Sequence, residues 1–186
     1  MTEMKSRRGI YLLPNLLTTG ALFSGFYSIV AAMNQHFGSA AIAIFVAMIL
    51  DGMDGRIARL TNTQSAFGMQ YDSLSDMISF GLAPSLVIYQ WALFGMGKLG
   101  WLAAFVYTAC ASLRLARFNT QAPSVDKRYF QGLPSPGAAA VLGGLVWFGS
   151  SYGLVDGTTI GVICFLVTVI IGLLMVSNIR YHSFKE

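Results

Sequence analysis

Charged residues are scarce in this chain. Only 11% of its 186 residues are Asp, Glu, Lys or Arg, whereas 55% are hydrophobic and the mean hydropathy is +0.61. A soluble domain has about a quarter charged residues, so the composition excludes a water-soluble globular protein and indicates an integral membrane protein. Internal repeats, low-complexity segments and a separate soluble region are also lacking. We therefore expect residues 1–186 to form a single transmembrane domain.

Charge is missing altogether from several long runs, namely 9–50, 77–97, 99–113, 129–155 and 157–179. A membrane-spanning helix needs about 20 apolar residues, and most of these runs are long enough. The first run is interrupted only by the polar residues 34–38, which divide it into helices near 11–33 and 39–60. The sequence predicts an all-α, polytopic membrane protein with six transmembrane helices.

Lys and Arg lie almost entirely on one side of these six predicted spans. Of the 12 basic residues, Lys98 alone falls on the other side. Cytoplasmic flanks accumulate Lys and Arg, so both termini and the end of the second helix are expected in the cytoplasm. As a separate expectation, the protein belongs to the inner membrane of a prokaryote. The net charge of +4 is then a topology signal and an attraction to anionic lipid. It does not require a nucleic-acid partner.

Cysteine and histidine are equally rare, with two residues of each type. Cys110 and Cys164 fall inside predicted spans, which favours packing roles over a disulfide. His36 and His182 fall at opposite membrane faces, and neither has a partner at metal-ligand spacing. The remaining candidates for chemistry are the carboxylates.

Four of the eight acidic residues lie in one stretch, DGMDGRIARLTNTQSAFGMQYDSLSD, which runs from Asp51 to Asp76. Asp51 and Asp54 are three residues apart and Asp72 and Asp76 are four apart, so each pair shares one face of a helix. A short polar turn at 61–65 would bring the two faces together. Carboxylates inside a membrane are costly, and four of them repel unless cations lie between them. Such hard oxygen ligands suit Mg²⁺, Mn²⁺ or Ca²⁺ rather than zinc.

Small residues accompany the carboxylates. Gly55 and Ala58 share the helix face of Asp51, and Gly68 lies on the face of the second pair. We expect a groove there, in which a flat or bulky group could approach the backbone. Arg59 would direct a planar, bidentate donor at an anion in this groove. Divalent cations, an arginine and a close-approach groove together describe a site for a diphosphate.

The whole stretch resembles the signature of the CDP-alcohol phosphatidyltransferases. It reads Asp51-x-x-Asp54-Gly55-x-x-Ala58-Arg59, then eight residues, then Gly68-x-x-x-Asp72-x-x-x-Asp76. The resemblance implies that the phosphatidyl group of a CDP-linked lipid is transferred to an alcohol while CMP leaves, with the help of two divalent ions, Mg²⁺ or Mn²⁺. It also implies a homodimer. By this resemblance the metal ligands are Asp51, Asp54, Asp72 and Asp76, the general base is Asp76, and the residues that contact the CDP-lipid include Gly55, Ala58, Arg59, Ser65 and Gly68.

The first predicted helix contains PNLLT, with Asn15 and Thr18 in an otherwise apolar span. This segment is similar to the Pro-Asn-x-x-Thr that opens many of these enzymes and helps to hold the nucleotide, which adds Asn15 and Thr18 to the CDP-lipid site. Pro14 is compatible with the start of a helix. The alternative is that Asn15 and Thr18 only join helices through hydrogen bonds.

Two later stretches bear on the acceptor alcohol. LRLARFN (113–119) and FQGLPSPGAA (130–139) resemble the membrane-embedded phosphatidylserine synthase branch of the family. This resemblance implies transfer from CDP-diacylglycerol to L-serine. Arg114 and Arg117 could bind the serine carboxylate, although both could simply be basic residues at the interface. Gly132, Pro134 and Ser135 would form a rigid turn whose backbone binds the amino acid, or a plain loop before a helix.

Other functions fit parts of the same pattern. A phosphatidyltransferase for glycerol 3-phosphate would need another basic cluster, for which Lys127 and Arg128 are available, and an archaeal ether lipid would fit the site as well as an ester lipid. A divalent-cation transporter could line its pore with the aspartates. However, the acids gather at one membrane face, and no polar path continues through the last two predicted helices.

Overall fold

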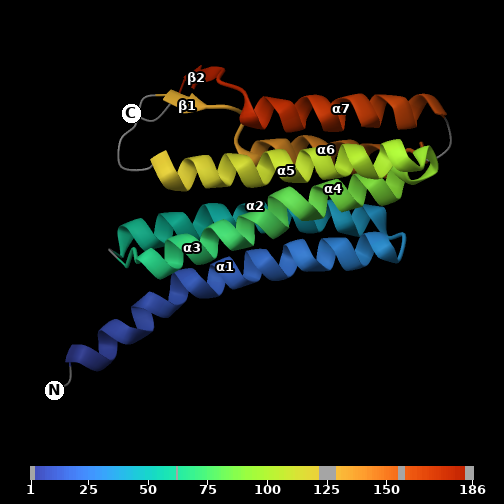
Figure 1. The fold of residues 1–186 in the computed structure, drawn as a ribbon. Coiled ribbons are helices and arrows are strands. Elements are labelled where there is room, and N and C mark those ends of the chain that lie inside the picture. The colour runs from blue at the N-terminus through green and yellow to red at the C-terminus, as the bar shows by residue number, and fades with distance from the viewer. Residues whose placement is uncertain (1–2, 62, 122–128, 155–157, 183–186) are drawn as a thin grey trace.

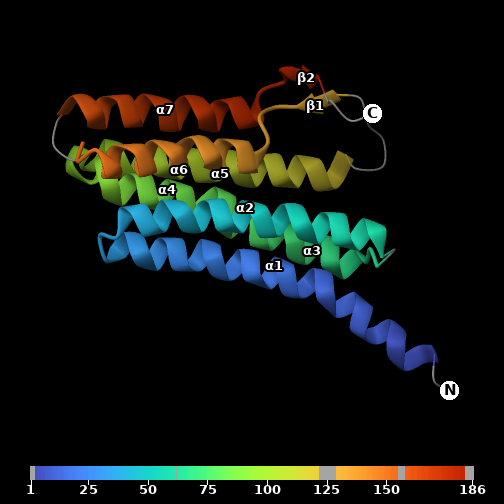
Figure 2. The ribbon, with the colours of Figure 1, turned by 180° about the vertical axis from the view of Figure 1, so that it is seen from behind.

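The computed structural model describes residues 3–61, 63–121, 129–154 and 158–182. The described chain is a bundle of long helices that run side by side (Figures 1 and 2). The first helices are α1 (Glu3–Met33) and α2 (Phe37–Leu60). A long third helix follows in segments: α3 (Ala66–Asp76), the π-helical η1 (Met77–Leu82), α4 (Ala83–Ile88), the π-helical η2 (Tyr89–Leu93) and the 3₁₀ turn η3 (Phe94–Met96). The chain continues with α5 (Lys98–Gln121), β1 (Tyr129–Gln131), α6 (Ser135–Ser151), α7 (Thr158–Val176) and β2 (Arg180–His182).

The helices confirm an integral membrane architecture. Five of them are long and apolar enough to cross a bilayer, within the part of the chain that the structure describes: Pro14–Met33, Phe37–Leu60, Ala66–Met96, Lys98–Thr120 and Thr159–Val176. Thr159–Val176 agrees with the charge-free run 157–179, whereas Phe37–Leu60 continues past the end of its run at residue 50 and Ala66–Met96 begins before the run 77–97, so these two helices include the aspartates. Helix α6 has 17 residues and is also apolar, but it is shorter than the other five.

Small residues let the helices approach closely, as is usual for packing in lipid. Alanines fill the α1–α2 contact, where Ala31, Ala40 and Ala47 are almost fully buried. A Cβ atom at Gly25 of α1 would lie only 2.5 Å from the Ser79 hydroxyl of η1. This close approach places α1 directly against the third helix, near the aspartates.

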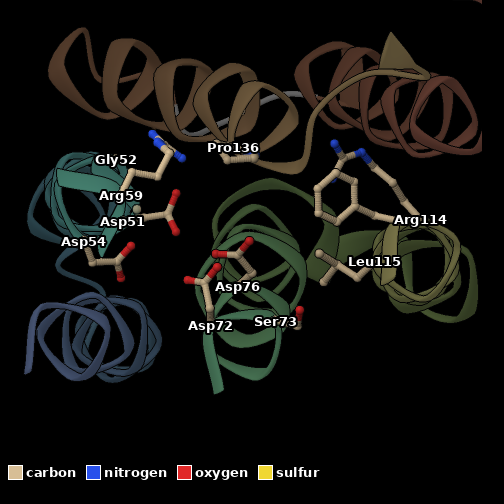
Figure 3. Close-up of a pocket in the computed structure, with 12 residues that line it drawn as sticks. Asp51, Gly52, Asp54, Arg59, Asp72, Ser73, Asp76, Arg114, Leu115 and Pro136 are labelled. Atoms are coloured by element: carbon tan, nitrogen blue, oxygen red, sulfur yellow. The ribbon is translucent and has the colours of Figure 1, made fainter. Parts of the chain in front are cut away.

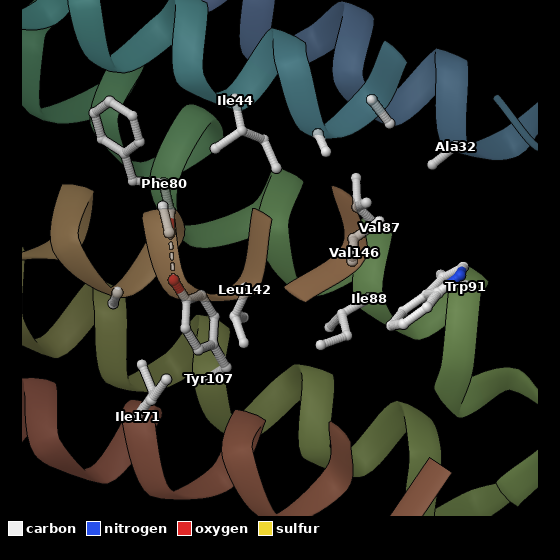
Figure 4. Packing of buried hydrophobic residues seen from close by; sticks show 14 of the residues in the cluster. Ala32, Ile44, Phe80, Val87, Ile88, Trp91, Tyr107, Leu142, Val146 and Ile171 are labelled. Carbon is white, nitrogen blue, oxygen red and sulfur yellow. Dashed lines mark hydrogen bonds between the residues drawn. The ribbon is translucent and has the colours of Figure 1, made fainter. Parts of the chain in front are cut away.

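The apolar core lies in the middle of the bundle, among α2, the third helix, α5 and α6 (Figure 4). Ile44, Phe80 and Leu142 are fully buried there. The buried Tyr107 hydroxyl donates a hydrogen bond of 3.0 Å to the Phe80 carbonyl, which belongs to the π-helical segment η1. Backbone groups in lipid must find partners within the protein, and α5 supplies one here. Both cysteines are buried and free, which confirms that they form no disulfide with each other.

Two short strands, which the sequence did not predict, lie beside the last two helices. Strand β1 precedes α6, and β2 follows α7. They pair antiparallel, with Tyr129 opposite His182 and Gln131 opposite Arg180. Gly132 follows β1 with a φ of 76°, and a Cβ there would lie 2.4 Å from the Met175 carbonyl oxygen at the end of α7. Only glycine fits this contact. The strand pair and Gly132 thus fix the start of α6 against the end of α7.

Candidate active site

A pocket of about 290 Å³ lies at the end of the bundle where α2 and α5 end and α3 and α6 begin (Figure 3). Four elements therefore contribute to its wall. The lining residues are Asp51, Gly52, Asp54, Gly55, Arg59, Asp72, Ser73, Asp76, Arg114, Leu115, Phe118 and Pro136. All four aspartates predicted from the sequence are among them.

Three of the carboxylates converge. Asp51 of α2 and Asp72 and Asp76 of α3 each offer one oxygen atom, and these atoms lie within 4.8 Å of one another. The Asp72 Oδ1 atom is buried and has no hydrogen-bond partner among the described residues. Carboxylates this close repel one another unless a cation lies between them, and a buried acceptor without a partner is costly. The three carboxylates fit a hard divalent cation such as Mg²⁺ or Mn²⁺.

Asp54 lines the pocket but is held apart from those three. Its side chain is only 4% exposed, and its Oδ2 atom accepts a 2.6 Å hydrogen bond from the Thr18 hydroxyl of α1. Thr18 is equally buried and does not line the pocket. The structure therefore places Thr18 beside a carboxylate, in a hydrogen bond that joins α1 to α2, which is the alternative to nucleotide contact left open from the sequence.

The turn between α2 and α3 brings the two aspartate pairs together. The backbone N–H of Thr63 donates to the Ala58 carbonyl at 3.1 Å, and the Thr61 and Thr63 hydroxyls are 2.8 Å apart. Ser65 is the N-cap of α3, because its hydroxyl accepts from the Gly68 N–H at 3.0 Å. Ser65 is exposed and lies outside the lining of the pocket, so its visible role is to start α3.

The expected groove exists beside α2 but not beside α3. A Cβ atom at Gly52 would have nothing within 4 Å, and one at Gly55 would meet only the Arg59 guanidinium, at 3.6 Å. At Gly68 the space is already filled, since a Cβ would lie 3.1 Å from the Ser65 hydroxyl and 3.5 Å from the Asn15 side chain. Ala58 does not line the pocket. The open backbone surface is therefore that of Gly52 and Gly55.

The two arginines of α5 point to different places. Arg114 lines the pocket, where its guanidinium donates a 2.7 Å hydrogen bond to the fully buried Ser135 hydroxyl, while its buried Nε has no partner among the described residues. Arg117 instead donates to the Val176 carbonyl and to the Asn178 side chain at the end of α7. Of the two, only Arg114 is placed to meet a substrate in this pocket.

The turn before α6 contributes none of its three predicted residues to the lining of the pocket. Gly132 packs against α7, and the exposed Pro134 stands at the N-cap position of α6. The Ser135 hydroxyl already accepts a hydrogen bond from Arg114. Pro136, which the sequence analysis did not single out, is the residue of this segment that lines the pocket. Lys127 and Arg128, proposed for a phosphate-bearing acceptor, lie outside the described residues.

Several other lining residues were not predicted as site residues. Leu115 and Phe118 form an apolar wall beside Arg114. Phe118 lies one helical turn after Arg114, which was the available signal for it, whereas Leu115 directly follows Arg114 and had no such signal. Ser73 exchanges hydrogen bonds with the Asn119 side chain at 3.0 and 3.2 Å, which links α3 to α5 at the rim. That pairing depends on which helices are neighbours, so no local sequence pattern indicates it.

Comparison with known proteins agrees with this geometry. The family model for CDP-alcohol phosphatidyltransferase matches residues 11–178. A protein of Helicobacter pylori named CDP-diacylglycerol–serine O-phosphatidyltransferase is 41% identical over 177 residues, which cover 95% of this chain and 74% of that protein. Proteins of the same name from Bacillus subtilis (34% identical, covering 94% of this chain and 92% of that protein) and Mycobacterium leprae (38%, covering 88% and 57%) are also similar. With its paired aspartates gathered in one pocket and the match extending over nearly all its helices, this chain belongs to the CDP-alcohol phosphatidyltransferase family.

Proposed function

We propose that this protein transfers the phosphatidyl group of CDP-diacylglycerol to the hydroxyl of L-serine, giving phosphatidylserine and CMP. The observation that carries the proposal is one pocket that combines three converging carboxylates, an open glycine surface and a half-buried arginine, Arg114. The names of the relatives support serine as the acceptor. A cation transporter lacks comparable support, because the aspartates gather in a pocket at one end of the bundle.

The aspartates would hold two divalent ions, Mg²⁺ or Mn²⁺. Asp51, Asp72 and Asp76 supply the converging oxygen atoms, and Asp54 supplies the oxygen that Thr18 leaves free. Bound there, such ions would neutralise the diphosphate and offset the charge that develops as CMP leaves.

The lipid's diphosphate would lie along the backbone of Gly52 and Gly55, where no side chain intervenes. Arg59 borders this surface and would donate hydrogen bonds to the phosphate oxygens. Asn15, whose side chain lies near Gly68, would contact the nucleotide from α1. In this arrangement the leaving CMP is held by α2 and by Asn15 of α1.

Serine would bind on the α5 side of the pocket. Arg114 would hold its carboxylate, since the buried Nε lacks a partner and a guanidinium matches a carboxylate in geometry. Asp76 would take the proton from the serine hydroxyl as its oxygen forms a bond to the lipid-side phosphorus and the bond to CMP breaks. A base in this position is expected to raise the rate by about 10²- to 10⁴-fold.

We further propose that residues 1–186 form one domain with six spans, both termini in the cytoplasm, in the inner membrane of a prokaryote. A 17-residue α6 would be about 26 Å long, close to the thickness of the hydrocarbon core, and so can be the sixth span. The pocket would then face the cytoplasm, where serine and CMP are soluble. The working unit would be a homodimer.

An acceptor assay tests the proposal. Purified protein is supplied with CDP-diacylglycerol, Mn²⁺ and either L-serine, glycerol 3-phosphate or inositol, and both CMP and the lipid product are measured. We expect CMP release and phosphatidylserine with L-serine only. CMP release with glycerol 3-phosphate but not with L-serine would show that serine is not the acceptor. The proposed phosphatidyl transfer would still stand.

A further inference from the structure

Thr18 makes contacts with both helices that carry the aspartates. Its hydroxyl donates to Asp54 Oδ2 of α2 at 2.6 Å, and its backbone carbonyl accepts a 3.2 Å hydrogen bond from the Ser75 hydroxyl of α3. Ser75 lies between Asp72 and Asp76 in the sequence and is buried. One residue of α1 therefore connects the helix of one aspartate pair to the helix of the other.

The position of Thr18 argues against direct contact with a ligand. Its side chain is 4% exposed and is absent from the pocket lining, whereas Asp54 lies in the lining. The hydroxyl has one proton and two nearby acceptors, the Pro14 carbonyl at 3.1 Å and the Asp54 carboxylate at 2.6 Å. The shorter contact is to the charged acceptor, which forms the stronger hydrogen bond.

We propose that Thr18 is a positioning residue, which orients the Asp54 carboxylate toward the metal ions and keeps the two aspartate pairs at a fixed separation. Because Thr18 holds Oδ2 of a carboxylate that lines the pocket, it limits how that carboxylate can rotate there. Partners that orient a metal ligand typically change metal affinity by about 10- to 100-fold. This inference rests on the proposed metal binding by the four aspartates, and it assigns Thr18 to the aspartates rather than to the nucleotide.

Two variants at position 18 separate the hydroxyl from the shape of the side chain. Thr18→Val keeps the branched shape and removes the donor, whereas Thr18→Ser keeps the donor and removes a methyl group. The matched control is Thr19→Val, which makes the same change one residue away, where the exposed hydroxyl contacts Tyr71 at 2.9 Å. Thermal unfolding of each purified protein in detergent checks that it is folded.

The primary readout is Mn²⁺ binding without any lipid, followed by the electron paramagnetic resonance signal of free Mn²⁺. We expect Thr18→Val to weaken Mn²⁺ binding about tenfold, and Thr18→Ser and Thr19→Val to stay within about threefold of the wild type. In activity assays, Thr18→Val should need about tenfold more Mn²⁺ for half-maximal rate. At saturating Mn²⁺ its KM for CDP-diacylglycerol should return to the wild-type value.

Unchanged Mn²⁺ binding in Thr18→Val, together with a raised KM for CDP-diacylglycerol at saturating Mn²⁺, would overturn the inference and show that Thr18 contacts the nucleotide. Equal weakening in Thr18→Ser and Thr18→Val would also overturn it, because the hydroxyl would not be the cause. Failure of the proposed metal site itself looks different. In that case the wild-type protein and an Asp72→Asn variant would bind Mn²⁺ equally weakly.

Discussion

Asp76 is the residue for which the pocket suggests two roles, as ligand and as base. Replacing it with Asn removes the proton acceptor while keeping the size of the side chain, so we expect kcat to fall by about 10²- to 10⁴-fold. CDP-diacylglycerol binding, measured directly with radiolabelled lipid, should remain detectable because Gly52, Gly55 and Arg59 are unchanged. Near-normal turnover of Asp76→Asn would show that another group accepts the proton.

Arg114 and Arg117 provide a matched pair on one helix. Arg114→Lys keeps the charge but loses the planar fork, and we expect the KM for L-serine to rise about tenfold, the equivalent of roughly 1.4 kcal/mol. Serinol, which lacks the carboxylate, should be used equally well by wild type and variant. Arg117→Lys should have the smaller effect on the serine KM, because Arg117 contacts the end of α7. The reverse ranking would assign the carboxylate to Arg117.

Local spacing in the sequence was enough to predict that the aspartates share a site. It could not show which residues from other helices form hydrogen bonds with the side chains of the site. The i, i+3 and i, i+4 pairs predicted a shared site, and three of the four carboxylates do converge. The hydrogen bond from Thr18 to Asp54 joins residues 36 positions apart and depends on how α1 packs. The same is true of Arg114 and Ser135, which the sequence analysis treated as two separate contacts to serine.

At the scale of elements, the third helix is the least regular part of the bundle. The hydroxyl of Tyr107 satisfies the Phe80 carbonyl in its π-helical segment η1. Tyr107→Phe removes only this hydroxyl and with it the hydrogen bond to the Phe80 carbonyl. Hydrogen bonds inside membrane proteins are worth about 0.6 to 2 kcal/mol, so we expect a loss of stability of that size, measured by unfolding in mixed micelles.

Tyr89→Phe serves as the control for Tyr107→Phe, since Tyr89 is only partly buried and packs edge-on against Phe94 through its ring. It should change stability by less than about 0.5 kcal/mol. Equal losses in both variants would mean that the hydrogen bond to the π-helical segment contributes nothing specific.

The break between the first two helices was predicted well, whereas the internal form of the helices was not. The polar residues 34–38 mark where the chain leaves the membrane, because polar groups in lipid are costly. The structure places a turn at these residues, with Gln35 at a φ of 62°. The π-helical turns and the β1–β2 pair arise from contacts between distant segments, for which hydropathy holds no signal.

At the scale of the whole molecule, the proposed orientation can be tested by labelling single cysteines in whole cells. Cys110 and Cys164 are buried, and a parent in which both are Ala supplies a background without thiols. Gln64→Cys lies in the turn at the pocket end, and Lys98→Cys lies at the opposite end, both at exposed positions. A membrane-impermeant maleimide should label Lys98→Cys in intact cells and Gln64→Cys only after permeabilisation. The opposite pattern would place the pocket outside the cytoplasm.

The π-helical segment η1 begins directly after Asp76, and this position has a consequence for the spacing of core residues along the third helix. Each residue turns an α-helix by about 100°, so in a uniform helix the face that carries the aspartates would dictate which later residues meet the core. The wider turns break that rule, so the rotation of α4 about the helix axis is offset from that of α3. The residues of α4 that meet the core, such as the buried Val87, can therefore not be identified by α-helical spacing counted from Asp72 and Asp76.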